Sequence, residues 1–526
     1  MKHPASVFTA IAVSFLLVHG VALAAQNDEQ PHTGLLVGWG AADVTPEEPV
    51  VVQGQFHARV SEGVMDPLTA TALVFESLNN GESTGRAAMV SCDFSAVSDC
   101  IRDAVREHLR SALPELDPMS IFFSATHTHT GPATYAKPRY SQADTEEPFP
   151  YGVDLGVMPT ADYVAFAAER MAAAIIQAWN SRAPGGIGFG LGHAVVGRNR
   201  LMAYADGTSR MYGKTDDPDF RNVEGYEDHS VNLLFTYDRD SQLTGVVVNL
   251  ACPSQVSESL FELSADFWHE TRQELRKRLG AGVQVLGQAS AAGDQSPHIR
   301  IEQRAEERMW KLAGRTQREA IGNRIANAVM EVLPCAGKEI DWNPALIHRV
   351  ETLDLIRRPL SEENAQKAAS EREKYRKEYE GLVRDLEAHP EKREENRWYV
   401  NITRAYRRMK REDNVMRRFE EQQTQPTLPF EVHVLRLGDI AFATNPFELY
   451  LDYGMQIKGR SKATQTFLVQ LAGPGSYLPT PRSIAVGASG DGARGGQVGA
   501  GSRKLHEEGL GGFAAAFDLH AAVEVE

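Results

Sequence analysis

The sequence has few cysteines for its length and fewer basic than acidic residues. Four cysteines in 526 residues do not make the disulfide framework of a small secreted domain, so we expect free, buried thiols at Cys92 and Cys100. The 70 acidic and 55 basic residues give a net charge of -15. This balance disfavours nucleic acid and anionic membrane surfaces as partners and favours a neutral or cationic substrate.

Long hydrophobic runs are also scarce, and the chain begins with the only marked one. Lys2 precedes the apolar stretch AIAVSFLLVHGVALAA, which ends in small residues and is followed by the polar AQNDEQ. This pattern is typical of an export signal peptide, assigned to residues 1–24, with an uncleaved anchor as the alternative. We therefore expect a periplasmic or secreted protein whose mature chain has no transmembrane segment.

A β-α-β unit is predicted near the start of the mature chain. Residues 86–93 (RAAMVSCD) form an apolar strand pattern, Ser98 is expected to cap an amphipathic helix, and residues 120–127 (SIFFSATH) form the next strand. The two strands should be parallel, with Asp93 and His127 at their carboxyl ends. Ligands of open α/β sheets gather along that edge.

A second unit of the same kind follows later. Residues 246–252 (VVVNLAC) predict a strand, Ser264 is expected to cap the next helix, and Gly280 to end it before the strand VQVLGQAS. This unit presents Cys252 at one strand end and the loop 293–298 at the other. The two units are expected to contribute two halves of one site.

The remaining patterns complete an α/β protein with mixed sheets, β-α-β units flanked by helices, and a charged helical-hairpin insertion. A catalytic domain is predicted over 33–345 and 428–485, the insertion over 360–427, and an irregular tail over 486–526. The highly charged insertion reads as a solvated hairpin, with a lid or partner arm as the functional alternative.

Three local signals make sharper predictions. Thr160 is expected to cap a helix over 160–180, and Gly438 with Asp439 to form the turn of a hairpin. Pro446 suits the first position of a helix, which would place Glu448 in its first turn.

The motif THTHTGP suggests a metal site. If the chain is extended there, His127 and His129 point to one side and the neighbouring threonines to the other. Imidazole is a common metal ligand, and a shared face suits one ion. The alternative is a polar strand end without a ligand.

Several short motifs together resemble the neutral/alkaline non-lysosomal ceramidase family over about residues 34–485. They are GWGAADVTP, SATHTHTGP, GDQSP, NPFE and SYLPT, in this order along the chain. The resemblance implies a zinc amidase with His127, Glu448 and Tyr477 as ligands. It also places the family's active-site serine at Ser296.

One departure concerns the second histidine ligand of the family. It is expected near the end of VVVNLAC, where this chain has no histidine. Three residues are candidates for the vacant ligand position: His129 beside the first ligand, His229 at the start of the preceding strand, and Cys252 as a thiolate. Cys252 is alternatively a small core residue.

Other side chains are expected to assist at the metal. His129 is suited to bind the developing oxyanion or to move a proton, and Asp93 either orients an imidazole or caps a helix. Asp66 is a plausible polar site residue. Ser296 is expected to position the substrate carbonyl or to act in hydrolysis, although no activating base beside it can be identified.

Three functions are compatible with these patterns. The first is an exported zinc hydrolase that cleaves the amide of an N-acyl sphingoid lipid or a related small molecule. The second keeps the metal site but acts on a glycan or another polar substrate, because fold does not fix function. The third is a non-catalytic binding protein on a decayed enzyme fold, which the missing histidine favours.

Overall fold

The computed structural model describes residues 32–135, 149–474 and 476–487. Its largest sheet contains strands β1 (Gly34–Asp43), β5 (Thr69–Asn79), β6 (Glu82–Cys92), β7 (Ile121–Ala125), β8 (Ala183–His193), β13 (Ser230–Asp238), β14 (Leu243–Leu250) and β16 (Gln284–Ala289). They lie in the order β16-β14-β13-β8-β1-β5-β6-β7. The outermost pairs, β14 with β16 and β6 with β7, are parallel, and the pairs between them are antiparallel.

A second sheet packs against one face of the first. It contains β18 (Leu346–Ile356), β19 (Thr427–Leu437), β20 (Ile440–Thr444) and β22 (Gln465–Val469). Between the sheets lie buried apolar side chains such as Phe75 and Phe122 from the large sheet and Phe442 and Phe467 from the small one. Because strand side chains alternate, the other face of the large sheet is left for helices.

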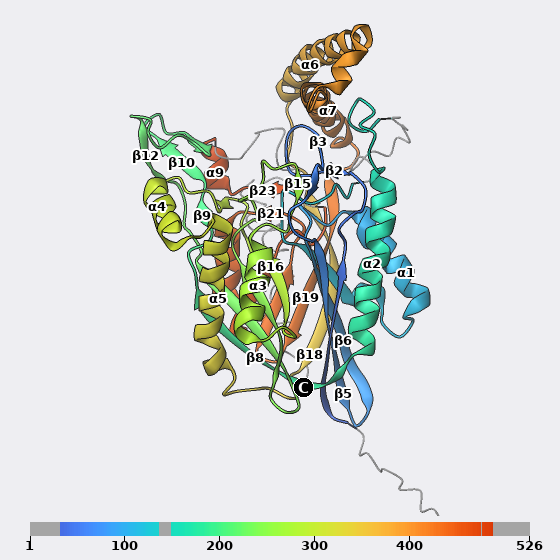
Figure 1. Cartoon of the computed structure of the whole chain (residues 1–526), viewed down its shortest axis with the longest axis vertical. Helices are drawn as coiled ribbons and strands as arrows, with labels where there is room; N and C mark the ends of the chain where they lie inside the picture. Colours follow the sequence, from blue (N-terminus) through green and yellow to red (C-terminus); the bar gives the residue numbers. More distant parts are fainter. Residues whose placement is uncertain (1–31, 136–148, 475, 488–526) are drawn as a thin grey trace, which may run out of the picture.

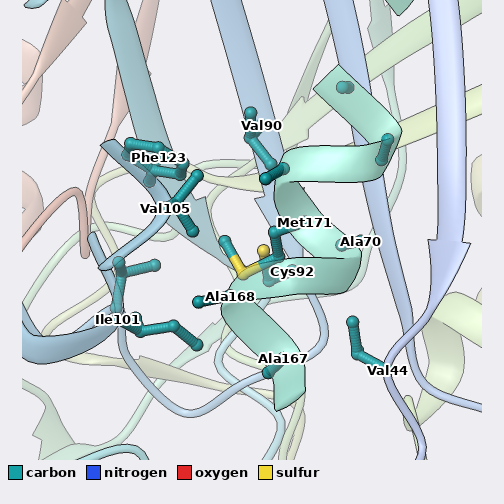
Figure 2. Packing of buried hydrophobic residues seen from close by; sticks show 14 of the residues in the cluster. Val44, Ala70, Val90, Cys92, Ile101, Val105, Phe123, Ala167, Ala168 and Met171 are labelled. Atoms are coloured by element: carbon teal, nitrogen blue, oxygen red, sulfur yellow. The ribbon is translucent and has the colours of Figure 1, made fainter. Parts of the chain in front are cut away.

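Four helices cover that other face: α1 (Asp99–Ala112), α2 (Thr160–Asn180), α3 (Phe267–Leu279) and α5 (Gln317–Ala336). Figure 2 shows the cluster under α1 and α2, where Cys92 packs beside Val90, Val105 and Met171. All four cysteines are free, Cys92 is buried as expected, and Cys100 is only partly buried. The predicted mixed α/β fold with flanking helices is confirmed.

Both predicted β-α-β units are present. The Ser98 hydroxyl accepts a hydrogen bond from the Ile101 amide at 3.3 Å, which caps α1 as predicted. The predicted cap of α3 is wrong, because Asp266 holds that position and accepts from the Phe267 amide at 2.7 Å. Ser264 instead accepts from the Asp266 amide.

The three other local predictions have different outcomes. Gly438 has a positive φ of 61° and joins β19 to β20, as the hairpin signal predicted. The helix predicted to start at Pro446 is wrong: Glu448 begins the short strand β21 (Glu448–Leu449), which pairs with β23 (Tyr477–Leu478). Helix α8 (Leu451–Arg460) starts afterwards. At α2 the cap position is Pro159, and Thr160 makes no capping bond.

The helical insertion is docked onto the main body at its inner end. It consists of α6 (Glu362–Ala388), the short helix η2 (Pro390–Glu394) and α7 (Val400–Glu421), which project beyond the sheets in Figure 1. Between β2 (Val51–Val52) and β3 (Arg59–Val60), the Ala58 amide donates to the Thr403 hydroxyl at 3.1 Å. The insertion therefore contacts the loop that leads to Arg59.

The other short elements lie mostly in connections: β4 (Gly63–Val64), η1 (Pro118–Ser120), β9 (Arg198–Asn199), β10 (Leu201–Tyr204), β11 (Ser209–Met211), β12 (Phe220–Val223), β15 (Glu262–Leu263), β17 (Gln295–Ser296), α4 (Gln303–Ala313) and α9 (Pro481–Ala485). Among the described residues, none of the helices has the length and apolar composition needed to cross a membrane. The signal peptide predicted for 1–24 and almost all of the tail predicted for 486–526 lie outside the described residues.

Candidate functional site

The two histidines of the THTHTGP motif lie together beyond the end of β7. Their rings meet edge to face with centroids 4.7 Å apart, and the two Nε2 atoms are 3.2 Å apart. The expected side-by-side placement is present, but its cause differs. His127 has a φ of +63°, so the chain turns through a left-handed conformation and is not extended. Such conformations in non-glycine residues cluster at functional sites.

A backbone contact fixes the orientation of His127. Its Nδ1 lies 2.5 Å from the Ser95 carbonyl oxygen, which can only accept, so Nδ1 carries the proton when the ring is neutral. Nε2 then presents a lone pair toward the Glu448 carboxylate, whose Oε2 is 3.5 Å away. Two electron-rich atoms facing each other favour a shared proton or metal cation between them.

Glu448 and Tyr477 stand side by side because β21 and β23 pair in parallel at these residues. Between them and the rest of the site lies Arg200, which is 2% exposed. Its guanidinium donates to the hydroxyls of Tyr477 at 3.0 Å and Tyr212 at 2.7 Å, and lies 3.9 Å from the Glu448 carboxylate. Burial raises the pKa of Glu448, but the contact with His127 in its protonated form and the charge of Arg200 outweigh it and leave that pKa below its ordinary value.

The GDQSP loop approaches the same strands. A side chain on Gly293 would lie 2.3 Å from the Glu448 carbonyl oxygen, so only glycine allows this approach. Ser296 is fully buried, and its hydroxyl lies 2.5 Å from Nδ1 of His298. The sequence identified no base beside Ser296, and the structure places His298 there.

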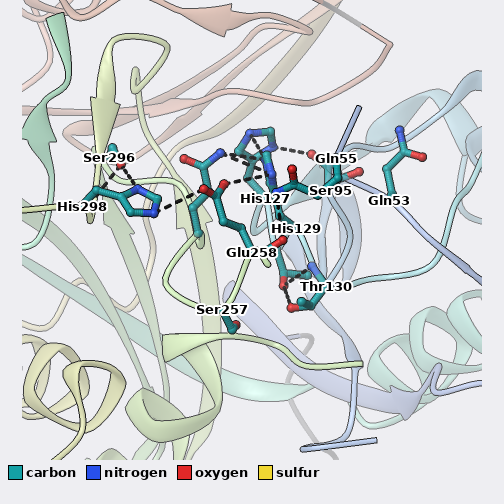
Figure 3. Close-up of polar contacts among 12 residues, drawn as sticks. Gln53, Gln55, Ser95, His127, His129, Thr130, Ser257, Glu258, Ser296 and His298 are labelled. Atoms are coloured by element: carbon teal, nitrogen blue, oxygen red, sulfur yellow. Dashed lines mark hydrogen bonds and ion pairs between the residues drawn. The ribbon is translucent and has the colours of Figure 1, made fainter. Parts of the chain in front are cut away.

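Glu258 joins the two halves of the site (Figure 3). Its carboxylate lies 3.3 Å from Nε2 of His298 and 3.5 Å from Nδ1 of His129. The Gln255 amide, from the same loop, lies 2.8 Å from Nε2 of His129. Burial, with the nearby charges of His127 and Arg200, lowers the pKa of His129 well below its ordinary value, so this imidazole is neutral.

The contacts close into a ring of polar side chains, here called the polar ring. Tyr212 completes it, because its ring meets that of His298 edge to face at 5.5 Å and its hydroxyl binds Arg200. The members in order of contact are Glu448, His127, His129, Glu258, His298, Tyr212, Arg200 and Tyr477.

Within the described residues, no contact joins the Asp93 carboxylate to an imidazole, and Ser98 holds the cap position of α1. Its carboxylate accepts from Arg272 at 2.7 and 2.9 Å, from the Thr69 amide at 2.8 Å and from the Thr126 hydroxyl at 3.2 Å. It therefore ties two strand ends to α3. Asp66 is likewise paired with Arg318, at 2.6 Å, outside the polar ring.

Two candidates for the vacant ligand position lie outside the polar ring. His229 is 3.4 Å from Glu227, and in the described part of the chain no contact joins it to His127 or Glu448. Cys252 is fully buried in the core under α3 and α5, and its thiol faces the Pro253 carbonyl oxygen. Burial raises the pKa of Cys252 well above its ordinary value, which disfavours a thiolate.

The donors in place fit part of a metal site. Across the described ranges, no group of three or more His, Cys, Asp or Glu side chains is arranged to hold an ion. His127 and Glu448 face each other at 3.5 Å, which suits two ligands of one zinc ion with bonds of about 2.1 Å. The phenol of Tyr477 beside Glu448 is the further donor that the resemblance implies.

Two solved structures with a similar fold are ceramidases. A neutral ceramidase from Pseudomonas aeruginosa superposes with a TM-score of 0.63 at 16% identity, covering 94% of this chain and 76% of its own. The fold is neutral-ceramidase-like. A ceramidase complexed with C2 matches with a TM-score of 0.58 at 14% identity, covering 88% of this chain and 72% of its own. No family model and no curated protein matches the sequence.

Several members of the polar ring were not predicted from the sequence. Arg200, Tyr212 and Glu258 carry no local motif, and each reaches the site through a partner far away in the chain. The only usable signal for Glu258 is its place in the loop that follows β14, because such loops collect at the carboxyl edge of a sheet.

Proposed function

We propose that this protein is a hydrolase that cleaves an amide bond with the aid of a divalent metal ion, most simply zinc. The proposal depends mainly on one observation: His127, Glu448 and Tyr477 lie next to one another in a neutral-ceramidase-like fold. An N-acyl sphingoid lipid is the substrate class proposed, together with export directed by residues 1–24. The resemblance of GDQSP and NPFE to ceramidase motifs supports the same reaction.

In this proposal the metal is held by His127, Glu448 and Tyr477, with a fourth position open to water. A zinc ion so bound lowers the pKa of its water to about 7 and polarises a carbonyl group. The Ser95 carbonyl oxygen holds Nδ1–H of His127 and so directs Nε2 toward Glu448. Carbonyl groups that fix a ligand imidazole in this way are common around metal sites.

The remaining polar groups are suited to the charge that develops during amide hydrolysis. Arg200 is a fixed cation whose donors reach Tyr477 and Tyr212, so it can stabilise a negatively charged oxygen in a water-poor environment. His129 is neutral and lies next to His127. A neutral imidazole there can donate or accept a hydrogen bond to substrate without adding charge.

One observation favours a second candidate function, a binding protein without catalysis. At the strand end where the resemblance implies an imidazole, the chain has Cys252, which is buried in the core. A polar substrate such as a glycan remains the alternative for an active enzyme, since its hydrolysis would use the same metal chemistry.

Metal analysis of the purified protein after dialysis tests the metal. We expect about one bound divalent ion per chain in the wild type and in Cys252→Ala, and loss of the ion in His127→Ala with the fold retained. Both variants should be checked by circular dichroism. Absence of the ion from the wild type, or its retention in His127→Ala, would contradict the proposed ligand set.

A substrate panel separates the proposed reactions. N-acyl sphingoid amides of different chain length are compared with glycans, with release of fatty acid or reducing sugar as the readout. Amide cleavage that is lost in His127→Ala supports the proposal. A protein that binds the lipid without cleaving it, with or without metal, would be the binding protein.

A further inference from the structure

Glu258 is partly buried and differs from the buried Asp66 and Asp266 in how weakly its carboxylate is bound. The carboxylates of Asp66 and Asp266 accept hydrogen bonds from donors at 2.6 and 2.7 Å, which leaves them fixed in structural roles. In the part of the chain that the structure describes, the side chains facing the Glu258 carboxylate are imidazoles at 3.3 and 3.5 Å. The side chain is also 26% exposed, so a substrate can reach it.

The backbone of Glu258 is nevertheless held firmly. Its carbonyl oxygen accepts hydrogen bonds from Gln55 Nε2 at 2.9 Å and from Arg59 Nη1 at 2.8 Å. Arg59 is fully buried and also donates to the carbonyl oxygen of His129. One guanidinium therefore fixes Glu258 relative to the histidine motif. A firmly held backbone places the Glu258 carboxylate reproducibly, which proton transfer requires.

Ser296 holds the imidazole on the other side of Glu258. Its hydroxyl accepts from the His298 backbone amide at 3.1 Å and lies 2.5 Å from Nδ1. Ser296 has no exposed surface, whereas the His298 side chain is 32% exposed. The hydroxyl is therefore out of reach of a substrate, and its contacts direct Nε2 of His298 toward Glu258.

Charge favours the carboxyl over the imidazoles as the proton carrier. Burial, with the positive charges of Arg200 and Arg300, lowers the pKa of His298 to about 4. Burial raises the pKa of Glu258 above its ordinary value although the charges of Arg200 and Arg59 oppose it, so this carboxyl takes up and releases a proton closer to neutral pH than an exposed glutamate does.

We propose that Glu258 is the catalytic residue that exchanges protons with the substrate, and that His298 and Ser296 are its positioning residues. The inference rests on the proposed amide hydrolysis. Water forms a new bond to the carbonyl carbon and gives a proton to the Glu258 carboxylate. The bond from carbon to nitrogen then breaks as Glu258 passes that proton to the departing nitrogen, which yields a carboxylic acid and an amine and leaves the protein unchanged.

Kinetics with two leaving groups test this role. Glu258→Gln keeps the shape of the side chain but cannot exchange a proton. We expect it to lower kcat for an alkyl amide about 100-fold, the usual scale of general acid–base catalysis. A 4-nitrophenyl ester of the same acyl group has a leaving group that needs no proton, so only the proton uptake from water is lost, and the loss in kcat should be at least about tenfold smaller than for the amide. Equal losses with both substrates would assign Glu258 a structural role and overturn the inference.

Matched variants complete the kinetic test. Glu62→Gln removes a carboxylate that pairs with Arg397 on the surface and should leave both activities unchanged. Ser296→Ala should lower kcat for the amide by about tenfold and have little further effect in a Glu258→Gln background, because the two residues act through one proton transfer. A larger loss in Ser296→Ala than in Glu258→Gln would make Ser296 the reactive group and overturn the inference.

A readout without substrate separates this inference from the proposed function. In protein labelled with ¹³C at glutamate carboxyl carbons, the signal absent from Glu258→Gln should titrate above the ordinary value of about 4.3, and Ser296→Ala should shift it. A protein that shows this titration but cleaves no amide contradicts the proposed function and, with it, the catalytic role of Glu258. An ordinary titration of Glu258 in a protein that does cleave the amide overturns this inference alone.

Discussion

The ion pair between Asp93 and Arg272 offers a direct test of how the site edge is held together. Both side chains are buried, and the guanidinium binds the two carboxylate oxygens at 2.7 and 2.9 Å. Asp93→Asn keeps the shape of the side chain but leaves Arg272 charged and without its counter-ion. Breaking one partner of a buried pair costs about 3–5 kcal/mol, a large part of the roughly 5–15 kcal/mol that holds a typical protein folded.

Urea unfolding followed by circular dichroism measures this loss. Glu62→Gln is the matched control, because its ion pair with Arg397 has side chains 43% and 40% exposed, and such surface pairs contribute at most about 1 kcal/mol. The reasoning is refuted if both variants lose the same small amount of unfolding free energy. If Asp93→Asn has normal stability but has lost activity, Asp93 would instead act by orienting an imidazole of the site.

Two further predictions concern a glycine and a buried histidine. Gly54 has a φ of +111°, and a Cβ there would lie 2.7 Å from the His129 side chain. Gly54→Ala should therefore displace that imidazole and lower the rate of amide cleavage at least about tenfold. Unchanged kinetics would show that the loop around Gly54 moves to accept the methyl group without displacing His129. Burial, with the charge of His433, lowers the pKa of His348 to about 3, so the unfolded state binds a proton first as the pH falls below about 6.5. His348→Phe should therefore lose less unfolding free energy than the wild type between pH 6.5 and pH 4, and equal losses measured by calorimetry would contradict this assignment.

Local signals predicted most of the secondary structure near the site. The Ser98 cap and the Gly438 turn are as predicted, because capping and turn formation depend on residues within a few positions. The same logic failed at Glu448, where pairing with the strand at Tyr477 replaced the predicted helix. Strand pairing between distant segments outweighs a weak local preference for helix. Such pairing cannot be predicted from the residues around Glu448 alone.

The sequence alone determined the two β-α-β units and the helices at 362–388 and 400–421, since these follow from periodicity and short-range sterics. Tertiary structure alone decided that Glu258 lies between His129 and His298, that Arg272 neutralises Asp93, and that Cys252 is buried. These partners meet because the order of strands in the sheet brings distant loops to one edge, and that order depends on how the whole chain buries its apolar surface.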